Sequence, residues 1–590
     1  MRSRRVVFCL LHLFTAAYLV VADNITYSVI TDSAEATNFG IIINNVTYPL
    51  TPSNISSILF QGSAPSNAIY TYAKFDKNTN ALIQREPFSR PAVSTSTPNE
   101  FFNRNWNKKD IKHFELVASI PKNYNRRDDE DLHPEGEIPT IQVVANQSDF
   151  DNLHHNVAKD ITITADIVYI RKDSVKLFKQ AEFEVGGRSS RQLTKISYNI
   201  KLNKQAKDDI SGFRKLKLRS TVTDPSYMRD YLTSDMLRAA NQPATRGSYV
   251  RVFLNGRPIG LYTIMEKYDD TWLKNEFNAG NKYKNGIFYE GEGGTGDKRA
   301  DLSYKGDNAT DYAGSAYSIA EKSDSGDDSL NDLIAFIKFI NQQLEFQKSA
   351  NQTSLNATVT DWESHLDVEG FLTCMALDFL QGSWDAYLQN TNNYFLYKSP
   401  ERNRFIYINW DYDYTMGSGP VSMKKISLGN YNEYGGVKTR PLMVALLNVP
   451  YYRALFERRL SDLITNIYNT DKSYPVIDSV VSLIQDDVAW DKTLPHVISG
   501  YEFVTPTVNN VLHGDFFKKS NIGTPTSLSI LTAVDFIIRL NSDIPFKNAI
   551  NGNTGHSSLY GVKEWVQVKL DNIKKNSGDT SLLPFLPLKR

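Results

Sequence analysis

The chain has 590 residues, a formal net charge of +0 and a hydrophobic content of 41%. At about 150 residues per domain, this length allows two to four domains, which is enough for a sizeable core. The balanced charge argues against a nucleic-acid binder, which usually has a strong basic excess. The apolar content argues against a disordered chain.

The N-terminus predicts a signal peptide over residues 1–22. Basic residues within the first five positions precede the apolar run Val6–Val21, which ends at the small residue Ala22. A signal anchor is the alternative interpretation. Once the peptide is removed, Cys374 is the only cysteine, so we expect no intrachain disulfide. Its apolar neighbours favour a buried, unreactive thiol.

Seven N-x-S/T sites predict a glycoprotein of the secretory pathway. The acceptors are Asn24, Asn45, Asn54, Asn146, Asn308, Asn351 and Asn356. The last residues, Leu582–Arg590, lack the apolar tail of a lipid-anchor signal, so we expect release from the cell rather than membrane anchoring.

The first predicted domain, residues 23–150, combines a small β-module with a connection. Short β-type runs alternate with Asn, Ser and Pro turns over residues 23–90, and residues 91–140 contain five prolines and many charges. Longer strands are predicted from about residue 160 onward. They span Ile161–Tyr169, Ala181–Val185, Ile196–Leu202 and Leu216–Arg219.

A predicted helix follows Asp224-Pro225-Ser226, where an N-cap precedes a proline in the first turn. The next two strands, Tyr249–Leu254 and Gly260–Met265, are joined by Asn255-Gly256, a strong hairpin signal. Residues 291–327 are rich in Gly, Asp and Ser and predict an exposed loop.

The chain beyond residue 326 is predicted to be mostly helical, so the fold class is α+β with a strand-rich half before a helix-rich half. One β-pair, Asn393–Tyr397 with Arg404–Ile408, interrupts the helices. Helical periodicity covers Leu330–Leu344, Trp362–Leu380, Leu442–Tyr468 with a break at Pro450, and Leu528–Leu540.

The strongest chemical signal surrounds that β-pair. A loop containing Asp385, Asn390 and Asn393 enters the hairpin, and a loop containing Asp411 and Asp413 leaves it. Hairpin geometry places both loops at the same end, where carboxylate and amide oxygens suit Mg²⁺ or Mn²⁺. Phosphoryl transfer uses one Asp at the acceptor hydroxyl and an Asn and a second Asp at the metal. A polar turn with side-chain caps, or a calcium site without catalysis, are the alternatives.

Four stretches together resemble the CotH kinase family, which includes a bacterial spore-coat protein and fungal surface proteins. The resemblance covers residues 160–545 in order, and single motifs of this kind would be weak alone. The stretches are Gly187–Arg191 with Lys195–Tyr198, Asp224–Ser226, Tyr249–Gly256 with Gly260–Lys267, and Trp384–Asp385 with Trp410–Asp413.

The nucleotide half of the site comes only from this resemblance. It implies that Lys195 contacts phosphate, with Lys201 and Lys217 as alternatives on nearby strands. Met265, Glu266 and the following lysine would form the linker where adenine stacks. The sequence departs from the family in having Ile196 where a second lysine is usual.

The remaining roles combine the resemblance with the loop pattern. Asp385 would be the catalytic aspartate, and Asn393 and Asp411 the metal ligands, with Asp413 and Asn390 as further candidates. The family implies a two-lobed, atypical protein-kinase-like fold over residues 160–545, with residues 546–590 as a C-terminal extension. ATP and Mg²⁺ or Mn²⁺ would be required.

Two functions follow as expectations. The first is a secreted kinase that transfers the γ-phosphoryl group of ATP to hydroxyls of secreted proteins or of itself. The second is an adhesin- or invasin-like recognition protein with little or no turnover, in contact with a receptor on a host or neighbouring cell. Either would be a monomer that is secreted or associated with a cell wall or spore surface.

Overall fold

The computed structural model describes residues 23–33, 37–122, 124–127, 129–187, 189–293, 298–497, 526–540 and 542–576. The predicted signal peptide and the last residues, 577–590, lie outside this range. Backbone contacts divide the chain into two compact units, Met1–Asn105 and Trp106–Arg590. In the described part of the chain, no helix has the length and apolar character needed to cross a bilayer.

The first unit contains one sheet of seven strands, in the order β6-β5-β2-β3-β4-β1-β7. Alternate residues such as Tyr27, Ile41 and Tyr72 fill its core, as expected when one face of each strand is buried. This sheet corresponds to the predicted β-module. The strands are β1 Asn24–Ile30, β2 Thr37–Ile43, β3 Val46–Pro52, β4 Leu59–Pro65, β5 Tyr70–Asp76, β6 Leu82–Arg85 and β7 Asn99–Phe101.

The second unit begins with a closed barrel of seven strands, in the order β10-β11-β12-β14-β13-β8-β9. The Asn255-Gly256 hairpin is confirmed, because β13 and β14 pair antiparallel around it. The strands are β8 Thr140–Val144, β9 Thr162–Ile170, β10 Val175–Val185, β11 Tyr198–Lys201, β12 Lys215–Arg219, β13 Gly247–Leu254 and β14 Arg257–Glu266.

The barrel extends past the predicted domain boundary at residue 150. Strand β8 lies parallel to β13 and antiparallel to β9, so it completes the barrel from inside the segment predicted as connection. Helix α1, Gln147–His155, follows it. The prolines before residue 140 are a valid loop signal, but they gave no information on the short buried strand after them.

A second sheet of four strands, β16-β15-β17-β18, lies in the helical half. Its centre is the predicted β-pair, now β17 Tyr394–Ser399 and β18 Arg404–Asn409. Strands β15 Phe288–Gly291 and β16 Tyr317–Glu321 extend it. Part of the predicted exposed loop at 291–327 is therefore an edge strand. It was not predicted because only one of its faces is partly covered, so its residues are a mixture of polar and apolar types without clear alternation.

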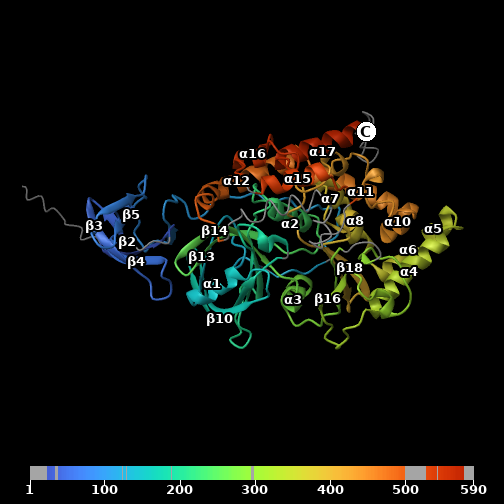
Figure 1. The fold of residues 1–590 in the computed structure, drawn as a ribbon, viewed down its shortest axis with the longest axis horizontal. Helices are drawn as coiled ribbons and strands as arrows, with labels where there is room; N and C mark the ends of the chain where they lie inside the picture. The colour runs from blue at the N-terminus through green and yellow to red at the C-terminus, as the bar shows by residue number, and fades with distance from the viewer. Residues whose placement is uncertain are drawn as a thin grey trace, which may run out of the picture. The chain divides into compact units, whose positions relative to one another are not determined.

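Helices make up most of the rest of the second unit (Figure 1). The predicted break at Pro450 is confirmed, since α10 ends before it and α11 begins at it. The helices are α2 Arg229–Ala239, α3 Asp270–Asn278, α4 Asn331–Gln347, α5 Gln352–Ala357, α6 Val359–His365, α7 Val368–Gln381, α8 Tyr387–Asn390, α9 Met423–Ile426, α10 Pro441–Leu447, α11 Pro450–Asn466, α12 Thr470–Asp491, α15 Ile530–Arg539, α16 Phe546–Asn551 and α17 Val562–Asn576.

The described part of the predicted C-terminal extension, residues 546–576, packs into this unit. Trp565 of α17 is fully buried, and its indole Nε1 donates to the carbonyl oxygen of Leu380 at 3.2 Å. Helix α17 also packs against α12 and α16, and all three lie at the same side in Figure 1. The described part of this segment, up to Asn576, thus belongs to the core of the unit.

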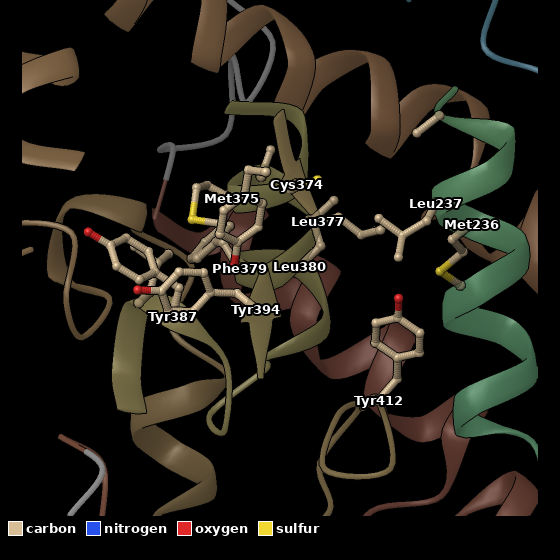
Figure 2. Close-up of a cluster of buried hydrophobic side chains, with 14 of the residues drawn as sticks. Met236, Leu237, Cys374, Met375, Leu377, Phe379, Leu380, Tyr387, Tyr394 and Tyr412 are labelled. Carbon is tan, nitrogen blue, oxygen red and sulfur yellow. The ribbon is translucent and has the colours of Figure 1, made fainter. Parts of the chain in front are cut away.

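The core between α2 and α7 holds Cys374, as predicted from its apolar neighbours. Figure 2 shows Cys374 on α7 in the same cluster as Met236 and Leu237 of α2. Burial raises the pKa of the Cys374 thiol well above its usual range. The thiol is therefore protonated and inaccessible, as expected for a structural cysteine.

Candidate active site

A cleft of about 510 Å³ lies between the barrel and the four-stranded sheet. The barrel side presents β12 and the turn between β10 and β11, and the other side presents the two loops that flank the β17–β18 hairpin. The loops meet, because the amide of Trp410 donates to the carbonyl oxygen of Asn393 at 3.0 Å. Asp385, Asn393, Asp411 and Asp413 all line this cleft.

Asp385 lies on the loop after α7, and three amides hold its carboxylate. Helix α7 ends at Gly382, whose positive φ of 63° lets the chain turn sharply. Asn392 Nδ2 donates to Asp385 Oδ1 at 3.1 Å and Asn393 Nδ2 donates to Oδ2 at 3.0 Å, while Asn390 also donates to Oδ1. Burial raises the pKa of Asp385 to about 7, although these amide hydrogen bonds oppose the rise.

Asp411 is the second carboxylate of the site, and it pairs with a basic residue that the sequence did not single out. Arg219 Nη2 donates to Asp411 Oδ1 at 2.8 Å, and Lys217 Nζ lies 3.9 Å from Asp411 Oδ2. Although burial acts in the opposite direction, these two cations hold the pKa of Asp411 well below its usual range. Asp411 is therefore a permanent anion at the cleft wall.

Arg219 joins two further carboxylates to this network. Its Nε lies 2.9 Å from Asp230 Oδ2 on α2, and its Nη2 lies 3.3 Å from Asp413 Oδ2. Burial and the neighbouring Asp411 charge raise the pKa of Asp413 well above its usual range. The remaining guanidinium nitrogen, Arg219 Nη1, is buried and has no hydrogen-bond partner among the described residues. A buried cationic N–H without a partner is costly unless a ligand uses it.

Both loops carry unfavourable backbone conformations at the functional residues. Asn393 has φ of 53° and Asp411 has φ of 60°. Residues with side chains rarely adopt this left-handed region, and such strain is concentrated at ligand-binding sites.

Lys217 of the barrel side lies close to two aromatic rings of the cleft, Tyr268 and Trp410. Burial lowers the pKa of Lys217 to about 8, and the Arg219 charge acts in the same direction. The Lys217 ammonium lies 4.9 Å from the ring centre of Trp410, and Trp410 packs edge-on to Tyr268 at 4.9 Å. Flat rings next to cations suit a ligand that combines an aromatic base with a polyanionic tail.

The turn between β10 and β11 closes the cleft with small and basic residues. Gly187 has φ of 82°, and a side chain there would lie 2.3 Å from Ser190 Oγ. Ser190 and Arg191 line the cleft, and Arg191 Nε donates to the carbonyl oxygen of Gly187 at 2.7 Å. The turn therefore requires glycine.

Lys195, the predicted phosphate contact, does not line the cleft. It is 5% exposed, and its ammonium donates to Asp491 Oδ1 on α12 at 2.7 Å and to the carbonyl oxygen of Leu261 at 2.6 Å. A lysine that pairs with a buried carboxylate in this way has a structural role. Lys201 also lies elsewhere, half-exposed and paired with Glu182.

Of the three predicted linker residues, only Lys267 lines the cleft. Met265 is fully buried in the core, and Glu266 accepts from His133 Nε2 at 3.1 Å and from the amide of Arg246 at 2.8 Å. Neither lines the cleft, whereas the next two residues, Lys267 and Tyr268, do. Strand β14 runs to Glu266, so alternation and burial keep its last residues in the barrel.

Glu266 belongs to a buried cluster with Asp129 and His133 whose spacing could hold a metal ion. Its donor atoms already have protein partners. Asp129 Oδ1 pairs with Arg246 at 2.7 Å, and His133 Nδ1 lies 2.7 Å from Ser248 Oγ. The cluster is accordingly a hydrogen-bond network.

Arg219, Tyr268 and Thr223 are cleft residues that the sequence did not predict. Arg219 carried one usable signal, because it lies two residues from Lys217 on one strand and thus faces the same side. Thr223 Oγ1 donates to Asp413 Oδ2 at 2.7 Å, a contact between distant segments that no local pattern indicates.

Comparison with known proteins identifies relatives of this chain. The family described as CotH kinase protein matches residues 183–501, more than half of the chain. Invasin CotH3 of Rhizopus delemar is 24% identical over 84% of this chain and 80% of its own length, and Invasin CotH2 of the same fungus is 22% identical over 84% and 79%. Inner spore coat protein H of Bacillus subtilis is 23% identical over 60% of this chain and 89% of its own length.

Proposed function

The chain belongs to the CotH kinase protein family, and we propose that it is a secreted atypical kinase that transfers the γ-phosphoryl group of ATP to a protein hydroxyl. One observation carries the proposal: Asp385, Asn393 and Asp411 line the same cleft as Lys217 and Arg219. Phosphoryl transfer is mainly positioning and charge stabilisation, and these are the residue types it uses.

The barrel side of the cleft would bind the nucleotide. Lys217 and the unpartnered Arg219 Nη1 offer positive donors for the phosphates, and Ser190 adds a hydroxyl. The base would lie near Tyr268 and Trp410. In this proposal the barrel is the nucleotide lobe and the helical half is the catalytic lobe of a two-lobed kinase-like fold.

A divalent metal fits the opposite wall. Mg²⁺ and Mn²⁺ prefer oxygen donors, and Asp411, Asp413 and the amide oxygen of Asn393 provide them next to the phosphate-binding cations. Asp411 would be the main ligand because its carboxylate stays ionised. When bound, the metal would neutralise phosphate charge during transfer.

Asp385 would act on the acceptor hydroxyl. It takes the hydroxyl proton while the acceptor oxygen bonds to the γ-phosphorus and the bond to the bridging oxygen of ADP breaks. The three asparagine amides fix the carboxylate, so its orientation is set before the acceptor binds.

A thermal-shift titration with ATP and Mg²⁺ tests the nucleotide site. A ligand that binds only the folded state stabilises it by about 2.7 kcal/mol at one hundred times Kd, so we expect the unfolding midpoint to rise with ATP concentration. Lys217→Met should remove most of the rise, whereas Lys201→Met, on the neighbouring strand, should not. If the unfolding midpoint of the wild type did not change with ATP concentration, this would contradict nucleotide binding.

A second candidate function is recognition of another cell, since several relatives carry the name invasin. The candidate surfaces are the N-terminal β-module and the segment at 298–321, which includes the edge strand β16. Deleting residues 299–312 and measuring cell adhesion tests the second surface. Unchanged adhesion would exclude that segment. The two functions are compatible on one chain.

Surface location is also part of the proposal, and it predicts N-glycosylation. All seven acceptor asparagines are exposed, including Asn45 in the β2–β3 turn and Asn308 before β16. Protein secreted by a eukaryotic host should lose mass on treatment with peptide N-glycosidase, with Asn converted to Asp at the occupied sites. Identical masses before and after treatment would contradict passage through a glycosylating pathway.

A further inference from the structure

A buried carboxyl–amide pair lies behind the cleft, where α7 meets the end of β18. Asp378 is 2% exposed and Asn409 is 4% exposed. Asn409 Nδ2 donates to Asp378 Oδ1 at 3.1 Å. The other two side-chain oxygens of the pair, Asp378 Oδ2 and Asn409 Oδ1, are buried and lack a hydrogen-bond partner among the residues described. Two acceptors in one pair therefore need a donor.

Among the residues that the structure describes, no cation acts on the pKa of Asp378. Its titratable neighbours are Cys374 one turn earlier on α7, Tyr407 on β18 and Tyr434, and burial raises the pKa of each well above its usual range. All three are therefore uncharged at neutral pH. Asp385 and Asp411 line the same small pocket and add only negative charge.

Burial raises the pKa of Asp378 to about 8, and the neighbouring Asn409 and Ser383 side chains act in the opposite direction. An isolated buried carboxylate is costly, and such a group takes up a proton instead. Protonation also provides the hydrogen-bond donor that the two unpartnered oxygens need, since a carboxylic acid donates through one oxygen and accepts through the other.

We propose that Asp378 is a neutral carboxylic acid whose Oδ2–H donates to Asn409 Oδ1, so that the two side chains form a cyclic pair with two hydrogen bonds. The proton supplies both missing partners at once. The pair ties the end of β18 to α7 through neutral groups only.

The pair is placed to position the metal-side loop. The carbonyl oxygen of Asn409 accepts from the hydroxyls of Tyr268 at 2.8 Å and Tyr412 at 2.9 Å, and Asp411 follows two residues later in its strained conformation. Fixing both the side chain and the carbonyl of Asn409 fixes the direction in which the chain enters Asp411. Asp378 is thus a positioning residue, and this consequence rests on the proposed function, whereas the acid–amide pair itself does not.

A water molecule or a cation beside Asp378 and Asn409 is the alternative to a proton, and the experiments below distinguish them. The small pocket beside the pair, of about 10 Å³, has room for about one water molecule. A water or a monovalent cation there would leave Asp378 ionised. Both alternatives differ from the proposal in the proton count of the folded state.

The first experiment is urea unfolding of the wild type and Asp378→Asn from pH 5 to pH 8. The asparagine amide can replace the acid, because its Nδ2 donates to Asn409 Oδ1 and its oxygen still accepts, so we expect a folded variant. The wild type in its folded state holds a proton that the unfolded chain, with a pKa of about 3.9, has released. Stability of the wild type is thus fully present at low pH and declines as pH rises toward about 8.

The expected result is a folding constant for Asp378→Asn that rises relative to wild type by up to about tenfold per pH unit across this range. A ratio that does not change with pH would overturn the proposal, because it means that Asp378 is ionised in the folded state. Infrared spectra provide the second readout. Other carboxyls with raised pKa values contribute to both spectra, so the readout is the difference spectrum of wild type minus Asp378→Asn. This difference should contain a protonated carboxyl C=O band, and its absence would also overturn the proposal.

Binding of Mn²⁺ tests the positioning role without any transfer assay. Asp378→Asn should retain the wild-type affinity, and Asp378→Ala, which loses both hydrogen bonds, should weaken it about 10- to 100-fold. Equal affinities in all three proteins would remove the positioning role. If no protein binds Mn²⁺, the proposed metal site fails, and the unfolding and infrared results still decide the state of Asp378.

Discussion

Replacing Asp385 by alanine is expected to lower phosphoryl transfer by about 10²- to 10⁴-fold, the usual contribution of a general base. ATP should still bind, because the phosphate-binding side chains lie on the barrel. Asp385 accepts hydrogen bonds from three asparagine amides. Two of them, Asn392 and Asn393, line the cleft and can bond to water when Asp385 is removed, so the fold should stay intact.

The measurement for Asp385 is initial transfer rate together with the thermal shift in ATP and Mg²⁺. Asp173→Ala, an exposed aspartate in the β9–β10 turn, is the matched control and should behave as wild type. Undiminished transfer by Asp385→Ala would remove Asp385 from the mechanism. Loss of both transfer and the ATP shift would instead indicate a damaged cleft.

Replacing Asp411 by asparagine should abolish metal-dependent activity. Even outer-shell partners of a metal site typically account for 10–100-fold, so losing the proposed ligand charge should cost at least about 100-fold in Mn²⁺ affinity and in transfer rate. The asparagine oxygen can still accept from Arg219, and Arg219 keeps its ion pairs with Asp230 and Asp413. The local structure should therefore persist.

Direct Mn²⁺ titration of Asp411→Asn separates metal binding from chemistry. Asp413→Asn provides the comparison, because Asp413 also contacts Arg219 but has a pKa well above its usual range and should contribute less to binding an ion. If Asp411→Asn bound Mn²⁺ like the wild type, the metal site would have to be placed elsewhere.

The sequence predicted the helical-half side of the site well because its signals are local. Asp385, Asn393 and Asp411 lie on loops that flank one hairpin, so strand pairing alone brings them together. The Asn255-Gly256 turn and the helix break at Pro450 could also be predicted, since each depends on the backbone preferences of one or two residues.

The barrel side was less predictable because its residues are assembled from distant segments. Lys195 and Lys217 both lie on or next to strands, and only the closed barrel decides that one faces Asp491 of α12 and the other faces the cleft. The helix α12 that supplies Asp491 lies in the part of the chain predicted to be mostly helical, but its bounds were not predicted. The phosphate-binding lysine could therefore not be chosen without knowing that Lys195 contacts Asp491.

The main gaps in the predicted fold have a similar cause. Strand β8 is short and follows a proline-rich stretch, and β16 has a mixed burial pattern at a sheet edge, so neither shows strong alternation. Helix α17 was assigned to an extension because its amphipathic face does not reveal where it packs. In the fold, Trp565 fills a space bounded by Gly382 and Gly417.

The most direct test of phosphoryl transfer uses the wild-type protein and ATP labelled at either the α- or the γ-phosphate, with Mg²⁺ or Mn²⁺. A kinase should place label on protein from γ-labelled ATP, none from α-labelled ATP, and no label when the metal is chelated. Label from α-labelled ATP would mean that a nucleotide is transferred instead. Absence of label from both, in a protein that binds ATP, would contradict a kinase and leave recognition as the function of this chain.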